Sequence, residues 1–168
     1  MSEQRWVWGA GLATVDADGT ILDAWFPEPE HGRAPADADT SALEPFAGPD
    51  ERRAVELEVV VAEIDLDAPP AGTVDAYLRL HALSHRLTAP NEVNLDGVFG
   101  HLPIVAWTNA GPMHPAAAAG LRPQLRRDGI HVHSLDKFPP LTAYVSPPGV
   151  RIADTARARP GAHLPPAP

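Results

Sequence analysis

The residues of this sequence best suited to chemistry are its histidines, and two pairs of them have spacings that could bind a metal ion. His81 and His85 are four residues apart in a segment with helical periodicity, so both rings would lie on one helix face. His131 and His133 alternate in a segment with strand character, which also places them on one face. Neither pair has an obvious third ligand, and the intervening glutamate of a zinc-protease helix is missing. We therefore expect packing or surface roles for both pairs and assign no metal ligand.

Other catalytic signatures are also missing from the sequence. It contains no cysteine, so thiolate chemistry and disulfides are excluded, and it has no Gly-x-Ser-x-Gly elbow, phosphate loop or convincing pair of acids. Gly9 and Gly11 could begin a phosphate loop, but they lie in an apolar run with no third glycine in register and no helix after it. Close packing of a large side chain or another backbone is the better reading of these glycines. We predict no catalytic and no cofactor-binding residue in this chain.

Composition narrows the possible partners and the compartment. The 168 residues suit one domain, and the net charge of −9, with Lys137 as the single lysine, leaves no basic face for nucleic acid. The start, Met-Ser-Glu-Gln-Arg-Trp, lacks a signal peptide, and no apolar run approaches the roughly 20 residues of a membrane span. We expect a cytoplasmic protein that binds neither nucleic acid nor membrane, and the absence of cysteine fits a reducing compartment.

The first third of the chain is predicted to be a β-hairpin, an acidic loop and a strand. Residues 6–15 and 20–26 are apolar runs on either side of an Asp-Gly turn, which favours a hairpin. Residues 27–53 are acidic and rich in proline and show no periodicity, so we expect a mobile loop. Residues 55–61 alternate between valine or leucine and mostly polar positions, which predicts a half-buried strand.

The second half interleaves helical and strand patterns without a regular βα repeat. We expect a helix capped by Thr73, and a later helix interrupted by Gly120 and Pro123. The predicted segments are a helix over 73–87, a strand over 104–108, a broken helix over 115–128, and strands over 130–135 and 141–145. This arrangement predicts the α+β class.

The last residues carry a six-residue period. Ile152, Ala158 and Leu164 recur every six positions, and Ala156 and Ala162 each fall four residues after the first two. This lattice of small aliphatic residues is typical of a hexapeptide β-helix, although a tail rich in proline and alanine could match it by chance. We predict an N-terminal α/β cap domain over residues 1–148, containing the acidic loop 27–53, and the start of a truncated β-helix over residues 149–168.

Five blocks of sequence, in order, resemble the N-terminal part of the actinobacterial type of tetrahydrodipicolinate N-succinyltransferase. The likeness extends from about residue 8 to Leu164. The blocks are Gly-Ala-Gly-Leu-Ala-Thr at 9–14 with Leu-Asp-Ala-Trp-Phe-Pro at 22–27; Asp-Ala-Tyr-Leu-Arg-Leu-His at 75–81 with Leu-Ser-His-Arg-Leu at 83–87; Val-Ala-Trp-Thr-Asn at 105–109; Asp-Lys-Phe-Pro at 136–139; and Gly-Val-Arg-Ile-Ala-Asp at 149–154.

The resemblance implies an acyltransferase of diaminopimelate and lysine biosynthesis. Such enzymes transfer the succinyl group of succinyl-CoA to the amino group of 2-amino-6-oxopimelate, the ring-opened form of tetrahydrodipicolinate. It also implies a homotrimer in which an N-terminal α/β domain precedes a left-handed β-helix, with active sites between neighbouring β-helices. The catalytic carboxylate and the residues that bind substrate and CoA lie on parts of the family that this sequence lacks. The chain alone is therefore expected to be inactive.

The resemblance further implies a divalent cation, such as Mg²⁺, near the trimer axis at the start of the β-helix. Ala156 stands where that ligand would align, and Asp154 is the nearest carboxylate. We therefore do not assign the family's cation to a residue of this chain.

Other interpretations of the sequence remain open. The chain could be a stand-alone, non-catalytic module that caps or binds a trimeric β-helix partner, or part of another hexapeptide acyltransferase with a different acceptor. A domain that binds a small ligand or a metal through the eight histidines is a further alternative. The early stop itself is consistent with a truncated gene model, a frameshift or a contig end.

Overall fold

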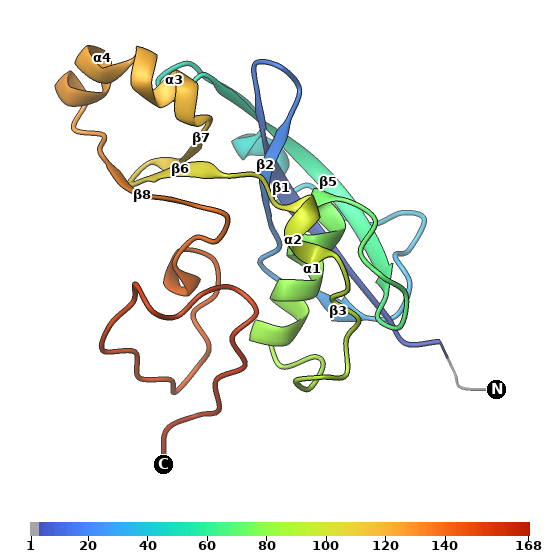
Figure 1. Cartoon of the computed structure of the whole chain (residues 1–168). Coiled ribbons are helices and arrows are strands. Elements are labelled where there is room, and N and C mark those ends of the chain that lie inside the picture. Colours follow the sequence, from blue (N-terminus) through green and yellow to red (C-terminus); the bar gives the residue numbers. More distant parts are fainter. Residues whose placement is uncertain (1–3) are drawn as a thin grey trace.

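A computed structural model describes residues 4–168 and shows an α+β fold with two antiparallel sheets and few helices (Figure 1). The larger sheet has the strand order β2-β1-β5-β4, with β3 also paired to β1, and the smaller has the order β7-β6-β8. The strands are β1 Trp6–Asp16, β2 Ile21–Trp25, β3 Glu30–His31, β4 Gly48–Asp50, β5 Val55–Asp65, β6 Val105–Thr108, β7 Gly111–Met113 and β8 Val132–Asp136. The helices are α1 Thr73–Ser84, α2 Val98–His101, α3 Pro115–Gly120 and α4 Arg122–Arg127, with short 3₁₀ turns η1 Glu44–Phe46 and η2 Leu141–Ala143.

The hairpin predicted for the first residues is confirmed. β1 and β2 are antiparallel neighbours, and Oδ1 of Asp16 accepts hydrogen bonds from the backbone N–H groups of Asp18 and Thr20, both at 2.9 Å. Gly19 has a φ of +82°, the left-handed conformation that glycine adopts without a steric penalty. The Asp-Gly pair therefore closes the turn by the expected mechanism.

β5 pairs with β1 along its whole length, from Asp16 opposite Val55 to Trp6 opposite Asp65. The strand is confirmed, but the predicted alternation holds for only part of it: Val55 is buried in the main core as expected, and the pattern then changes. Val60 and Ala62 pack against the main core, whereas Val61 is 45% exposed. Both faces of β5 carry aliphatic residues, so a period of two could not decide which face is buried.

Gly9 and Gly11 make room for one aromatic ring, as predicted from their place in a strand. A Cβ atom at Gly9 would lie 3.0 Å from Cδ1 of Phe26, and one at Gly11 would lie 2.7 Å from the same atom. Phe26 itself is completely buried. The two glycines thus allow this ring to lie directly on the β1 backbone, beneath helix α1.

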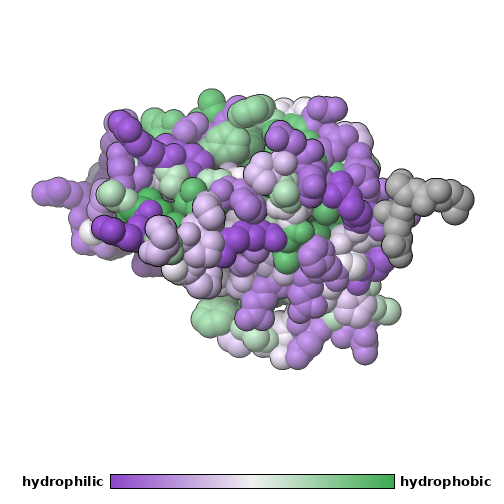
Figure 2. Space-filling view, turned by 90° about the horizontal axis from the view of Figure 1, so that it is seen from below, coloured by the Kyte–Doolittle hydropathy of each residue, from purple (hydrophilic) through white to green (hydrophobic). Residues whose placement is uncertain are grey.

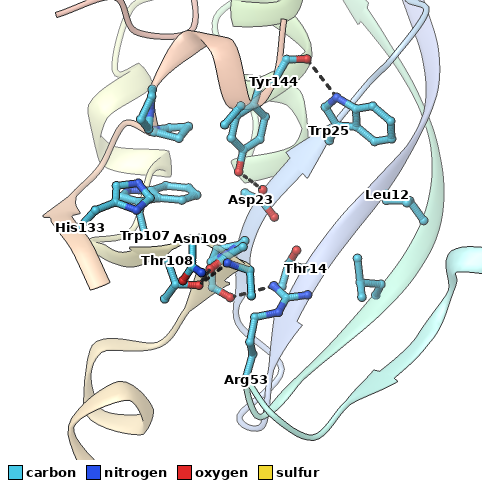
Figure 3. Close-up of a pocket in the computed structure, with 17 residues that line it drawn as sticks. Leu12, Thr14, Asp23, Trp25, Arg53, Trp107, Thr108, Asn109, His133 and Tyr144 are labelled. Atoms are coloured by element: carbon cyan, nitrogen blue, oxygen red, sulfur yellow. Dashed lines mark hydrogen bonds between the residues drawn. The ribbon is translucent and has the colours of Figure 1, made fainter. Parts of the chain in front are cut away.

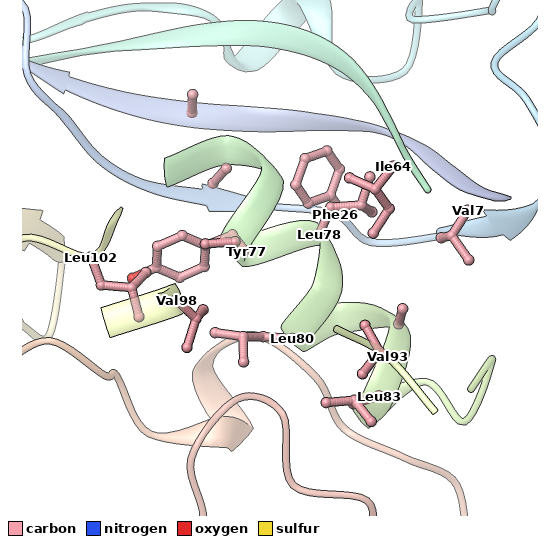
Figure 4. Close-up of a cluster of buried hydrophobic side chains, with 14 of the residues drawn as sticks. Val7, Phe26, Ile64, Tyr77, Leu78, Leu80, Leu83, Val93, Val98 and Leu102 are labelled. Carbon is pink, nitrogen blue, oxygen red and sulfur yellow. The ribbon is translucent and has the colours of Figure 1, made fainter. Parts of the chain in front are cut away.

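Helix α1 is buried along most of its length, and the side chains around it form the main core (Figure 4). It packs on β2 and β5, and all residues from Ala76 to Ser84 are buried. Arg79, only 1% exposed, donates from Nε to Asp75 at 2.5 Å and from Nη1 to the carbonyl oxygen of Asn94 at 3.1 Å. The helix is therefore a central element and not a surface helix with one polar face.

Both ends of α1 differ from the sequence prediction. The N-cap is Gly72, and the hydroxyl of Thr73 instead donates to the carbonyl oxygen of His101 at 2.7 Å. The helix ends at Ser84 instead of residue 87, because Arg86 adopts a left-handed φ of +64°. The backbone N–H of Leu87 then bonds to the carbonyl oxygen five residues back, the pattern of a Schellman C-terminus.

The acidic segment 27–53 is more structured than predicted. It contributes β3 and β4, which pair with β1 and β5, respectively, and it contains η1. Arg33 stacks on Trp6 at 3.9 Å from the ring centroid and pairs with Glu63 at 2.5 Å. The expectation of a mobile loop was wrong for these parts, because the sheet edges supply backbone partners that composition cannot reveal.

The smaller sheet carries the two short helices on one face. The break between α3 and α4 falls at Leu121, next to the predicted breakers Gly120 and Pro123. A second, small core joins these helices to the sheet through Ala106, Met113, Ala118, Leu125 and Ile130. Strand β7 was not predicted from the sequence.

The C-terminal residues differ most from the prediction. The expected strand over 141–145 is the 3₁₀ turn η2, and residues 149–168 contain turns and no strand. This last segment packs against the end of α1: Gly161 N–H donates to Oγ of Ser84 at 2.8 Å, and Arg86 Nε donates to the carbonyl oxygen of Leu164 at 3.0 Å. A rung is stabilised by stacking on neighbouring coils, and no following coil is part of this sequence. The boundary near residue 148 stays a prediction.

Within residues 4–168, none of the helices has the length and apolar character needed to cross a membrane. The face of the molecule in Figure 2 is mostly hydrophilic, with its apolar surface broken into separate patches.

His81 is a structural residue and not a metal ligand. It is completely buried; its Nδ1 bonds to the carbonyl oxygen of Tyr77 at 2.7 Å, and its Nε2 accepts from the N–H of Phe26 at 3.3 Å. With both nitrogens used, neither is free for a metal. Its ring stacks on that of His85, which confirms the packing role expected for this pair. Burial lowers the pKa of His81 from 6.5 to about 4, so the ring is neutral in the folded protein.

This burial predicts a loss of stability in mild acid. A pKa that is lower in the folded than in the unfolded state gives stability that is complete above pH 6.5 and is lost as the pH falls towards 4. The full effect is at most ~3 kcal/mol in the free energy of unfolding. Urea denaturation at a series of pH values from 7 to 4.5 should show this loss. In His81→Gln, the free energy of unfolding should depend less steeply on pH. His131→Gln, at an exposed site, is the control, and an unchanged slope in His81→Gln would contradict the assignment.

The packing of Phe26 predicts that β1 will not tolerate a methyl group at Gly11. Gly11→Ala should lower the free energy of unfolding by about 1–3 kcal/mol, since the new Cβ would overlap the Phe26 ring and the backbone beside it. Gly100→Ala is the matched control, because nothing lies within 4 Å of a Cβ at that position. Equal thermal midpoints for the two variants would show that the ring can move away.

Candidate functional site

A pocket of about 330 Å³ lies between the two sheets and the η2 turn (Figure 3). This volume is at the lower end of the range of small-molecule sites. Its walls are mainly apolar and come from β1, β2, β5, β6 and the turn before η2: Leu12, Trp25, Leu57, Trp107, Pro139 and Pro140. Three polar side chains, described next, give it its chemistry: Asp23 and Arg53 are buried, and Tyr144 is half-buried.

The first two are Asp23 and Tyr144, which join β2 to the η2 turn. The hydroxyl of Tyr144 donates to Oδ2 of Asp23, and the indole N–H of Trp25 donates to the carbonyl oxygen of Tyr144 at 3.0 Å. Tyr144 also stacks on Tyr77 of α1, with ring centroids 6.1 Å apart, and lies edge-to-face with Trp107 at 6.0 Å. One tyrosine thus holds the C-terminal turn against the larger sheet, helix α1 and the smaller sheet.

Asp23 is 4% exposed, which makes its charge costly. Burial raises the pKa of Asp23, and its interaction with Thr14, the hydrogen bond from Tyr144 and the charge of Arg53 only partly offset this. Its second oxygen, Oδ1, is buried without a hydrogen-bond partner among residues 4–168. Burial and the nearby Asp23 carboxyl raise the pKa of Tyr144 well above 10, so its hydroxyl stays protonated and acts as a donor.

Arg53 is the third of these side chains and reaches into the pocket from the turn before β5. It is 5% exposed; its Nε donates to Asp50 at 2.8 Å, and its Nη1 donates to the carbonyl oxygen of Pro112 at 3.1 Å. Gly111 has a φ of +118° and leaves the space that the guanidinium fills, because a Cβ there would lie 2.5 Å from Nη1. Figure 3 shows the guanidinium pointing towards Asp23 and Tyr144.

Two further polar residues of the pocket, Thr108 and Asn109, make hydrogen bonds within the smaller sheet and its turns. The Thr108 hydroxyl donates to the carbonyl oxygen of Gly111 at 2.6 Å. The Asn109 side chain donates to the carbonyl oxygen of Gly129 at 3.0 Å and accepts from the N–H of His131 at 2.8 Å. The arrangement is therefore suited to binding a small molecule, and it offers no activated nucleophile.

The residues singled out in the sequence do not assemble into a site. His133 lines the pocket, but its partner in spacing, His131, does not, and both residues are exposed. Across residues 4–168, no three or more His, Asp or Glu side chains are grouped so as to hold a metal ion. Asp154 accepts from the N–H of Ala156 at 3.1 Å within an exposed turn.

Asp23, Arg53 and Tyr144 were all missed by sequence reasoning. They are far apart in the chain, so no local spacing connects them. The one available signal was a charged residue in the middle of an apolar strand, Ile-Leu-Asp-Ala-Trp at 21–25. A buried acid in such a run needs a partner, although nothing in the sequence says which.

Comparisons with known proteins all lead to one family. A family profile described as "Tetrahydrodipicolinate N-succinyltransferase middle" matches residues 102–139, which include the strands of the smaller sheet. A 2,3,4,5-tetrahydropyridine-2,6-dicarboxylate N-succinyltransferase from Salinispora tropica is 46% identical over 177 aligned residues, covering 98% of this chain and 55% of the relative. A protein of the same name from Pseudomonas aeruginosa is 55% identical over 100 residues, covering 58% of this chain and 29% of the relative.

A solved structure supports the fold. The crystal structure of a protein from Campylobacter jejuni, named as a 2,3,4,5-tetrahydropyridine-2-carboxylate N-succinyltransferase, superposes with a TM-score of 0.67 at 19% identity. The match covers 92% of this chain and 53% of that structure. The chain thus spans about half the length of the relatives that it matches over most of its own length. By sequence the chain is therefore similar, over nearly its whole length, to about half of a protein named as a tetrahydrodipicolinate N-succinyltransferase.

Proposed function

We propose that this chain is the N-terminal part of an enzyme that transfers the succinyl group of succinyl-CoA to the amino group of ring-opened tetrahydrodipicolinate. The observation that carries the proposal is the 46% identity to a named N-succinyltransferase across 98% of the chain. The reaction would belong to diaminopimelate and lysine biosynthesis in the cytoplasm. The complete enzyme would be a homotrimer that uses succinyl-CoA as co-substrate.

In this proposal the described residues provide a domain that precedes the catalytic part. The pocket between the sheets contains no activated nucleophile, which agrees with catalytic groups located elsewhere in the protein. Residues 149–168 would form the first rungs of a left-handed β-helix once the following coils are present, because a rung needs a neighbour on which to stack. The family's divalent cation would require a ligand from outside the set of residues seen here.

The main alternative is a non-catalytic module that caps or binds a trimeric β-helix partner. This alternative is motivated by the match to only about half of the relatives' length. A chain that lacks the catalytic part could still dock on a protein that contains it. A different acyl acceptor is the other alternative. Both can be separated from the main proposal by activity measurements.

The test measures release of CoA from succinyl-CoA with a thiol reagent. The chain has no cysteine and therefore adds no background. The 168-residue chain alone should release no CoA above the buffer rate. A chimera should be active with tetrahydrodipicolinate when this chain replaces the matching part of the Salinispora tropica protein, and the unmodified relative is the positive control.

Three results would contradict the proposal. Activity of the chain alone would place catalytic groups within these residues. A chimera with the oligomeric state of the parent but active only on another amine would favour a different acceptor. A chimera of that same state that is inactive, but regains activity when the parent's own N-terminal part is restored, would favour the module.

A further inference from the structure

Arg53 is unusual because it is buried but only partly paired. Nε and Nη1 have partners in Asp50 and Pro112, whereas no hydrogen bond joins Nη2 to any residue in the described part of the chain. Asp50 is also shared, since the exposed Arg52 donates to its other oxygen at 3.1 Å. Nη2 is not among the buried side-chain atoms that lack a partner, so it still reaches accessible space and is open to a hydrogen-bond acceptor from a ligand.

Asp23 does not complete this arrangement. Within residues 4–168, no ion pair closer than 4.0 Å joins Arg53 to Asp23, although the charge of Arg53 acts on that carboxyl. The hydrogen bond from Tyr144 holds Oδ2 of Asp23, as seen in Figure 3. The pocket therefore lies beside a guanidinium that is paired with Asp50 but not with Asp23, the acid that lines the pocket.

Much of the remaining wall is apolar. Trp25 and Trp107 are each fixed by an indole hydrogen bond, to the carbonyl oxygens of Tyr144 and Asp136 at 3.0 and 2.9 Å. Leu12 and Leu57 continue the apolar surface along the larger sheet. An apolar wall with one buried cation at its edge is complementary to an amphipathic anion.

We propose that this pocket binds a small organic carboxylate, with the carboxylate on Nη2 of Arg53 and an apolar body against the indoles of Trp25 and Trp107. A planar carboxylate matches the fork of a guanidinium and makes a charge-assisted hydrogen bond. The site is separate from the succinyl transfer proposed above, so either proposal can fail without the other.

Asp23 sets the strength of this binding. Its carboxyl lies on the same side of the pocket as the guanidinium, and a negative charge there opposes a bound anion. Asparagine at this position would keep an oxygen to accept the Tyr144 hydroxyl and would remove the charge. Asp23→Asn should therefore bind the carboxylate more tightly, which a purely structural role for Asp23 would not produce.

The experiment is a titration of the ¹⁵N-labelled chain with hexanoate, followed by the indole N–H signals of its four tryptophans. The signals of Trp25 and Trp107 should shift and saturate, while those of Trp6 and Trp8, which do not line the pocket, should stay in place. 1-Hexanol tests whether the carboxylate is needed, and inorganic phosphate tests whether the apolar body is needed. Both should shift the two indoles much less than hexanoate at equal concentration.

Substitutions test whether the guanidinium of Arg53 binds the carboxylate. Arg53→Met should weaken binding about tenfold or more, as expected for loss of a charge-assisted hydrogen bond. Arg52→Met, which removes an exposed arginine that shares Asp50, should bind as the wild type does. Asp23→Asn should bind about threefold more tightly or better, through loss of a like charge.

Several outcomes would overturn the inference. These are equal shifts with hexanol or phosphate, shifts that extend to Trp6 and Trp8, wild-type affinity in a folded Arg53→Met, or weaker binding in a folded Asp23→Asn. The Arg53→Met variant could lose the chemical-shift dispersion of a folded protein in its NMR spectrum. In that case the Asp23→Asn titration and the comparison with hexanol test the inference without it.

Discussion

The burial of helix α1 is the constraint on which the rest of the structure depends. A helix enclosed on most sides can expose no polar group to water, so each one needs an internal partner. Arg79 has such partners in Asp75 and a backbone carbonyl, and His81 uses both ring nitrogens. Phe26 must also fit beneath the helix, which is possible only because β1 carries glycine there. Tyr77 of the same helix is an exception, because its hydroxyl is buried without a hydrogen-bond partner among residues 4–168.

The position of the pocket follows from how the smaller sheet and the η2 turn pack against the larger sheet. Helix α1 covers one face of the larger sheet, and the pocket lies between the other face of that sheet, the smaller sheet and the η2 turn. Tyr144 bridges the gap, through its contacts with Asp23, Trp25 and Tyr77. The space that it leaves open is lined by the other face of β1, β2 and β5, where Arg53 enters.

Local signals in the sequence were sufficient for much of the fold. The Asp-Gly turn, the strand with paired glycines and the break at Gly120 each depend on residues close in sequence, and all three were predicted. The caps of α1 and the edge strands β3 and β4 depend on distant backbone partners, which no local pattern encodes. The candidate site belongs to this second class, since Asp23 and Tyr144 are brought together by tertiary packing alone.

The hexapeptide period also shows the difference between a local sequence pattern and a structure that depends on distant partners. The spacing of Ile152, Ala158 and Leu164 is a property of the sequence, but a rung has no stable structure without the next coil. In the chain as described, the backbone donors and acceptors of this segment instead find Ser84 and Arg86 at the end of α1. Formation of a β-helix would have to compete with these contacts. Burial of aliphatic residues between stacked coils would favour the β-helix. The free energy gained when each added coil removes apolar surface from water would exceed the free energy of the few hydrogen bonds to α1 that are lost.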